Sequence, residues 1–448
     1  MNQKVVPFTN KVTRNPWVKA VQDSFLTILP FVLVGSFVTL IGLVPEIPWV
    51  RENWTWWPDL SPISSFSFGL MGLILAFLIP YFAMENKGVQ RTKLLAGATG
   101  IASYLMLAKP ALVVDEETWA MSATFEFDRF GAGGVFVALV VGLLVGLIFF
   151  SSSKWSFFKK SSSLPDFIIT WFDSLIPIAV VLGVSWLITF SFGFDAFAIL
   201  GTIFSPLLSI GQSYPGFVLI VFITVFIYSF GISSWVMGPI IFPIMFAGIA
   251  ENQAAVAAGL APTMINTQEV VYIGWIAIGG LGATLPLALM MLFAAKSKQL
   301  KAVGKAVIVP SIFNINEPVV FGAPIAFNPI LMIPMWINGL LLPLIVWPAL
   351  HFGMAPIPAE PFQIWYMPYP ISTWLVAPAI GSLILFVIVV AVATAVWFPF
   401  FRVYDNQLLV REGKTDEQQM ESVGASETPG TNRPAPRKAP TKRTRVEL

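Results

Sequence analysis

Residues 131–150, GAGGVFVALVVGLLVGLIFF, form a run of twenty positions without one polar side chain. About 20 apolar residues are needed for a helix to cross the ~30 Å hydrocarbon layer of a bilayer, so this run predicts a transmembrane helix. The chain of 448 residues is 56% hydrophobic and only 11% charged, against roughly 25% charged residues in soluble domains. We therefore predict an all-α integral membrane protein. Similar apolar runs cover 24–44, 66–84, 167–190 and 371–401.

The charges between the first spans alternate in sign. The segment before residue 24 and the loops near 87–93 and 154–160 are basic, whereas the loops near 45–65 and 109–129 are acidic. Short basic loops stay in the cytoplasm, which orients the spans 24–44, 66–84, 94–108 and 131–150 and places both termini inside. We expect eight to ten crossings in total. The net charge of +2 gives no reason to expect a nucleic-acid partner.

The last segment, 412–448, differs from everything before it. It has almost no large apolar residues and is rich in Pro, Thr and charge, so it cannot bury a core and is predicted to be a disordered cytoplasmic tail. Its final third is basic. One interpretation is attraction to anionic membrane lipid, and the other is a solvated tail without a specific role.

Residues 310–334, PSIFNINEPVVFGAPIAFNPILMIP, place Asn314, Asn316 and Glu317 among apolar neighbours. Five prolines prevent a continuous helix, and broken backbone at membrane depth needs cover from protein or a water-filled cavity. Ionisable groups inside a membrane are candidates for function. One carboxylate and two amides suit a polyhydroxylated ligand. The alternative is that Glu317 pairs with a cation or is protonated in place.

Two further stretches are weaker candidates. In 274–286, GWIAIGGLGATLP, the glycines permit close approach either of a neighbouring helix or of a ligand. In 228–239, YSFGISSWVMGP, Ser233 and Ser234 interrupt a helical pattern, although serines in membrane helices also bond back to their own backbone. The chain has no cysteine, which excludes disulfides and thiolate metal sites. We expect no metal and no cofactor.

The stretch from Phe313 to Pro334, with its core NEPVVFGAPIAFNP, resembles the membrane-embedded IIC component of the bacterial phosphotransferase system, lactose/cellobiose/chitobiose type. GGLGATLPLALMMLFAAKSKQLKAVGKA is similar to the Gly-rich helix and basic loop of that family, and WFPFFRVYDNQLL to the end of its last helix. VQDSFLTILPFVLVGSFVTLIG fits the first span. The resemblance covers about 1–411.

This resemblance implies a homodimer with the glucose-superfamily IIC architecture, about ten transmembrane helices per subunit plus re-entrant hairpins. Residues 1–210 would make the dimer contact, and residues 211–411 would form a transport half that moves like an elevator. Glu317 would hydrogen-bond the sugar hydroxyl destined for phosphorylation, flanked by Asn316 and Asn314. Trp374 would lie against the sugar, although only the Trp and the final Pro of a family Trp-Thr-Thr-Pro-Pro stretch are present here.

One departure from the family pattern concerns the sugar site. The family has a Gly-Ile-His-Gly turn, whereas this chain reads Gly231-Ile232-Ser233-Ser234. A serine hydroxyl still hydrogen-bonds a sugar but does not titrate near neutral pH as imidazole does. Either the substrate differs, or phosphorylation is impaired and the chain has another use.

The predicted function is that of the sugar-translocating subunit of a phosphoenolpyruvate-dependent phosphotransferase system in a bacterial cytoplasmic membrane. Its substrate would be a saccharide, with a β-linked disaccharide expected. Because the chain has no cysteine, the resemblance implies a separate phosphocysteine IIB protein as the phosphoryl donor. Two alternatives stay open: an ion-coupled secondary transporter that uses Glu317 as the coupling carboxylate, and a non-transporting sugar sensor or receptor.

Overall fold

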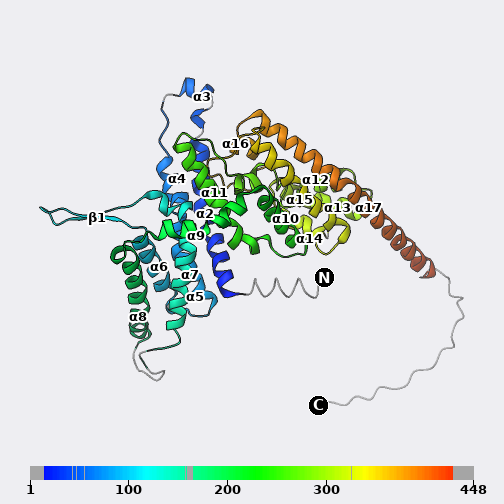
Figure 1. Cartoon of the computed structure of the whole chain (residues 1–448). Coiled ribbons are helices and arrows are strands. Elements are labelled where there is room, and N and C mark those ends of the chain that lie inside the picture. Colours follow the sequence, from blue (N-terminus) through cyan, green and yellow to red (C-terminus); the bar gives the residue numbers. More distant parts are fainter. Residues whose placement is uncertain are drawn as a thin grey trace, which may run out of the picture.

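The computed structural model describes residues 15–426 except 43, 47, 55, 157, 159–164 and 324. In this part of the chain almost every regular element is a helix, which confirms the predicted all-α class. One antiparallel hairpin, β1 (Ala111–Val114) paired with β2 (Met121–Thr124), is the exception. All eight strand residues are exposed, and the hairpin projects from the helical body (Figure 1).

The N-terminal helices pack around α5. The elements in chain order are α2 (Pro16–Gly42), η1 (Val44–Glu46), α3 (Pro48–Asn53), α4 (Ser61–Ser67), η2 (Phe68–Leu70), α5 (Met71–Asn86), α6 (Lys93–Leu107), η3 (Phe127–Phe130), η4 (Ala132–Gly134), α7 (Val135–Ser152) and α8 (Asp166–Trp186). Helix α5 contacts α2, α6 and α7. A small residue lets α7 approach, because a Cβ at Gly142 would meet Ile79 of α5. Close contact through small residues is typical of membrane helix pairs.

The second half is more interrupted. It contains η5 (Leu187–Ser191), α9 (Ala196–Gln212), α10 (Tyr214–Ser229), η6 (Ser234–Met237), α11 (Gly238–Ala257), η7 (Glu269–Gly274), α12 (Leu285–Phe293), α13 (Lys298–Ile312), α14 (Glu317–Gly322), α15 (Pro329–His351), α16 (Ile371–Val376) and α17 (Ile380–Ser426). Figure 1 shows α5–α8 on one side and α12, α13, α15 and α17 on the other, with α2 and α11 between them.

Two buried apolar clusters correspond broadly to the two sides. One comes mainly from residues 21–149, and the other mainly from residues 217–408. Helix α11 joins the first cluster despite its later position, because Phe242, Phe246 and Ile249 are buried there. The rings of Phe25 and Phe246 stack with centroids 6.1 Å apart. The division at residue 210 stays a prediction, and α11 packs across it.

The number of long apolar helices lies at or just below the lower end of the predicted range. The described residues contain seven helices that could cross a membrane, or eight if α9 and α10 count as one span bent by 78°. We expected eight to ten crossings, about ten from the resemblance. Helix α6 has only 15 residues, about 22 Å at ~1.5 Å per residue, and falls short of a full span. The region 310–334 is broken as predicted, into the end of α13, α14 and the start of α15.

The predicted start of the tail, residue 412, lies inside a helix. Helix α17 continues without a break from Ile380 to Ser426, because EGKTDEQQMES consists largely of good helix formers and lacks Pro. Low hydrophobicity therefore marked the end of the membrane segment and not the end of the helix. Residues 427–448, with the basic cluster, lie outside the described residues.

Candidate functional site

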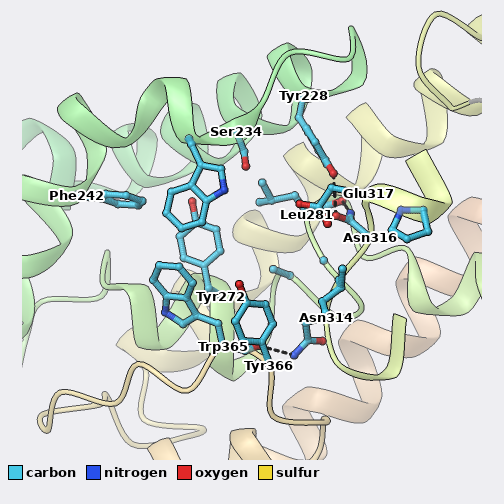
Figure 2. A pocket seen from close by; sticks show the side chains of 15 residues that line it. Tyr228, Ser234, Phe242, Tyr272, Leu281, Asn314, Asn316, Glu317, Trp365 and Tyr366 are labelled. Atoms are coloured by element: carbon cyan, nitrogen blue, oxygen red, sulfur yellow. Dashed lines mark hydrogen bonds between the residues drawn. The ribbon is translucent and has the colours of Figure 1, made fainter. Parts of the chain in front are cut away.

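A cavity of about 460 Å³ lies where the broken segments of the second half meet. Its lining comes from the end of α10, from η6 and the start of α11, from η7 and the Gly-rich loop after it, from residues 314–318 and from Trp365 and Tyr366. Figure 2 shows these side chains converging from several elements. Ligand pockets of proteins commonly have volumes of about 300–1,000 Å³, so this cavity suits a small organic ligand.

The loop before Glu317 owes its shape to local sequence. Helix α13 stops at Ile312 and Asn314 adopts a left-handed φ of 62°, a conformation that Asn tolerates better than most residues. Helix α14 then restarts at Glu317, with Pro318 in its first turn, where proline loses no hydrogen bond. This loop therefore delivers Asn314, Asn316 and Glu317 to the cavity wall together.

Asn314 uses both ends of its amide to hold two other loops. Its Oδ1 accepts from the Gly279 N–H at 3.0 Å, and its Nδ2 donates to the carbonyls of Trp365 and Met367, both at 2.9 Å. The resemblance placed Asn314 beside the sugar. Asn314 lines the cavity wall, where both of its N–H donors are used and one lone pair of its Oδ1 stays free.

Asn316 is also bonded to the protein through both ends of its amide. It is 5% exposed, its Oδ1 accepts from the Tyr228 hydroxyl at 3.0 Å, and its Nδ2 donates to the Leu281 carbonyl at 2.9 Å. Figure 2 shows Asn316 and Tyr228 beside Glu317. Asn316 therefore ties α10 and the Gly-rich loop to the start of α14.

Glu317 is the polar group of this loop whose side chain no described residue bonds. Its side chain is exposed to the cavity, and among the described residues no hydrogen bond or ion pair engages its carboxylate. No lysine, arginine or histidine in the described part of the chain forms an ion pair with Glu317, as the alternative interpretation would require. A carboxylate is an acceptor with about four lone-pair sites, so Glu317 offers a bound hydroxyl a strong partner.

The Gly-rich stretch is a loop, not a packed helix. Gly279, Gly280 and Gly282 have φ values of 72°, 101° and 85°, a region that glycine adopts without strain. Gly280 lines the cavity, and a Cβ there would overlap the side chain of Asn316. Of the two interpretations left open, close approach of a neighbouring helix describes Gly282, which packs against Met335 of α15, and close approach of a ligand stays a prediction.

Of the three other predicted site residues, one lines the cavity and two do not. Ser234 lines the cavity, whereas Ser233 is exposed and is not among the lining residues. Trp374 lies in α16, is 43% exposed and is also not among them. The tryptophan of this region that reaches the cavity is Trp365. Apart from Gln363, the run QIWYMP at 363–368 is apolar and aromatic. Nothing in this pattern marks Trp365 as a site residue in preference to Trp374.

An aromatic wall that the sequence analysis missed faces the polar loop. We use this name for Trp235, Phe242, Tyr272 and Trp365. The centroid of Trp365 lies 5.3 Å from that of Trp235, 6.0 Å from Tyr272 and 6.5 Å from Phe242. In the sequence, the one feature that could have indicated this wall is that Trp235 directly follows the predicted site residue Ser234. The cavity thus combines an apolar aromatic face with a carboxylate.

A family model described as "Phosphotransferase system, EIIC" matches residues 22–339, well over half of the chain. The chain belongs to this EIIC family. It is 30% identical to the cellobiose-specific EIIC component of Geobacillus stearothermophilus over 437 residues, covering 92% of this chain and 95% of the relative. It is also 30% identical to the lactose-specific EIICB component of Lacticaseibacillus casei, covering 94% of this chain and 73% of the relative.

The fold agrees with a solved EIIC structure. The crystal structure of ChbC, the IIC component of an N,N′-diacetylchitobiose-specific phosphotransferase system, matches with a TM-score of 0.82 and 28% identity, covering 92% of this chain and 99% of ChbC. The protein is therefore a membrane-spanning EIIC sugar permease of the cellobiose/lactose type from bacteria. EIIC components carry a sugar and work with a IIB component.

Proposed function

We propose that this EIIC permease binds a neutral β-linked disaccharide in the cavity, with Glu317 as the acceptor for a sugar hydroxyl. The observation that carries the proposal is that the Glu317 carboxylate and the aromatic wall line the same cavity of about 460 Å³. Sugars present apolar C–H faces and hydroxyl edges. An aromatic face suits the first, and a carboxylate without a protein partner suits the second.

The charge of the site supports a neutral substrate. The described lining residues include one carboxylate and no lysine or arginine. A sugar phosphate would bring like charge close to Glu317, which is unfavourable away from bulk water. The cavity is therefore suited to bind the unmodified sugar and to release it once it is phosphorylated.

The phosphoryl donor is proposed to be a separate IIB protein. The chain has no cysteine, and the lactose relative named EIICB is longer than this chain, which covers 73% of it. Phosphoryl transfer depends mainly on positioning and electrostatics. Glu317 would orient the attacking hydroxyl, and Ser234 supplies the serine hydroxyl that reaches the cavity at the turn where the family has histidine.

Glu317→Gln tests the site directly. A charge-assisted hydrogen bond contributes about 1.5–3 kcal/mol, so we expect at least about a tenfold loss of disaccharide affinity in purified protein. Binding should be measured by calorimetry with cellobiose, lactose and N,N′-diacetylchitobiose. Glu116→Gln, in the exposed turn between β1 and β2, is the matched control and should bind as wild type. Wild-type affinity in Glu317→Gln would place the sugar elsewhere.

A reconstituted uptake assay separates the phosphotransferase function from ion-coupled transport. Vesicles with the permease should accumulate sugar phosphate when a phosphorylated IIB protein is supplied inside. Accumulation of unmodified sugar driven by a proton or sodium gradient, without IIB, would instead support the ion-coupled alternative. The serine turn at 233–234 makes this comparison necessary.

A further inference from the structure

Gln363 occupies a buried position between the aromatic wall and a buried carboxylate. It is 1% exposed, and its Oε1 accepts from the indole Nε1–H of Trp365 at 2.9 Å. Its Nε2 donates to Oε1 of Glu269 at 2.6 Å. Glu269 is itself fully buried at the start of η7. The three side chains form a linear hydrogen-bonded chain that ends at the cavity.

The chemistry of the two ends fixes the direction of the Gln363 amide. An indole N–H only donates, whereas the carboxyl oxygen of Glu269 that faces Gln363 accepts. The amide must therefore point its oxygen at Trp365 and its nitrogen at Glu269. Reversing it would leave both contacts between like groups. Glu269 thus sets the orientation of Gln363, and Gln363 in turn sets that of the indole.

The backbone of this loop is held independently of the Gln363 side chain. The Phe362 N–H donates to Oε1 of Glu269 at 3.0 Å, and the Gln363 N–H donates to Oγ of Ser36 in α2 at 2.8 Å. The carbonyl of Trp365 accepts from Asn314. With the backbone fixed at these points, the Nε1 bond to Gln363 determines how the indole ring turns within its two side-chain torsions.

We propose that Gln363, oriented by Glu269, is a positioning residue that fixes the Trp365 indole for sugar stacking. The inference rests on the proposed function, since it assigns a role to one wall of the same sugar site. A ring held in place before the sugar arrives loses little conformational entropy on binding. Neither Gln363 nor Glu269 is among the residues that line the cavity, so the effect passes through Trp365.

A double-mutant cycle tests this. Gln363→Met keeps the length of the side chain and removes both hydrogen bonds, and Trp365→Phe keeps an aromatic ring and removes the Nε1–H. With the disaccharide from the three-sugar panel that wild type binds best, Gln363→Met should lose about three- to tenfold in affinity. In the Trp365→Phe background the same change should alter affinity by less than about twofold. Equal losses in both backgrounds would show a general structural role and overturn the inference.

Indole NMR supplies a readout without sugar. In protein with ¹⁵N-labelled tryptophan, the Trp365 resonance is the one missing from Trp365→Phe. We expect Gln363→Met to shift its N–H proton upfield through loss of the hydrogen bond. The single variant Glu269→Gln, which keeps a carbonyl acceptor for Nε2, should keep nearly wild-type shift and affinity. An unmoved resonance in Gln363→Met would contradict the inference even if affinity falls.

The controls separate this inference from the proposed function. Gln253→Met removes an exposed Gln–Glu contact of the same chemistry, to Glu360, and should change neither readout. If Glu317→Gln leaves sugar affinity unchanged, or no sugar of the panel binds, the proposed function fails. If Glu317→Gln weakens binding while Gln363→Met does not, only the positioning role fails.

Discussion

Asn314 and Asn316 stand beside the cavity, but their amides serve the protein. Each accepts one hydrogen bond through Oδ1 and donates through Nδ2 to backbone carbonyls of other segments. They therefore build the loop that presents Glu317, and Glu317 is left to meet a ligand. Replacing either asparagine should act indirectly, by moving Glu317 or the 365–367 backbone.

Gly280→Ala tests how tightly this loop is built. Its φ of 101° is strained for alanine, and the added Cβ would overlap Asn316. We expect a loss of sugar affinity of at least about tenfold, because Asn316 must shift and Glu317 follows it. Calorimetry of the purified variant measures this. Gly183→Ala in α8 adds a methyl group to open space and should bind normally; equal affinity in both variants would show that the loop yields without moving the site.

At the scale of elements, α17 caps the start of α13. Asp405 accepts from the N–H groups of Lys296 and Ser297, and Glu412 accepts from the Ser297 hydroxyl and the N–H groups of Lys298 and Gln299. Negative groups at a helix N-terminus satisfy free N–H donors and oppose the helix dipole. The extension of α17 beyond the apolar run therefore has a packing role.

Glu412→Ala should lower stability by about 1 kcal/mol, the usual loss when a capping side chain is removed. Thermal unfolding of the detergent-solubilised protein measures it. Deleting residues 415–448 keeps Glu412 and should leave both the unfolding midpoint and sugar binding unchanged. A deletion that weakens binding more than about tenfold would reveal an additional contact between residues 415–448 and the part of the chain that binds the sugar.

Asp195 joins the start of α9 to the segment before α7. It accepts from the N–H groups of Phe197 and Ala198, and from Arg129 Nη1 and Nη2 at 3.0 and 2.9 Å. Burial alone would raise the pKa of Asp195, but the hydrogen bonds from Arg129 and from the helix backbone hold it below its ordinary value. A depressed pKa means that the charged form stabilises the fold.

Asp195→Asn keeps a capping side chain and removes the charge. We expect it to cost about 0.5–1 kcal/mol at pH 7. Since the folded pKa is depressed, this stabilisation is complete above the unfolded pKa of about 3.9 and disappears as pH falls through the folded value. Thermal unfolding of both proteins from pH 7 to pH 3 checks this. A gap that stays constant below pH 4 would rule out the charge as its cause.

At the scale of the whole molecule, the orientation of the chain in the membrane stays a prediction from the basic loops. The structure adds suitable reporter positions. Glu117 lies in the exposed turn between β1 and β2, and Lys154 lies exposed just after α7. Helix α7 separates them and is apolar enough to cross the membrane. The homodimer implied by the resemblance also stays a prediction.

Single cysteines give a clean test because the natural chain has none. In intact cells, Glu117→Cys should react with a membrane-impermeant maleimide, whereas Lys154→Cys should react only after the membrane is opened. A reporter fused after Lys160 should likewise be cytoplasmic. Labelling of Lys154→Cys in intact cells, with Glu117→Cys protected, would reverse the topology.

The class of the molecule and the position of its broken segment follow from local sequence. Long apolar runs have one stable environment, the bilayer, and closely spaced prolines interrupt a helix wherever it lies. The Asn-Glu-Pro core is equally local, and it indicates the EIIC family. These properties depend on composition and covalent geometry, so they can be read along the chain.

Contacts between distant segments settle which polar groups are free and what faces them. The sequence places Asn314, Asn316 and Glu317 together, but only the fold shows that partners from distant segments engage the two amides and leave the carboxylate. Trp365 rather than Trp374 reaches the cavity. The hydrogen-bonded chain from Glu269 through Gln363 to Trp365 joins η7 to the loop before α16. Which polar groups are hydrogen-bonded, and which rings lie together, depends on contacts between residues that are far apart in the sequence. Such contacts form only in the folded chain, so local sequence patterns do not predict them.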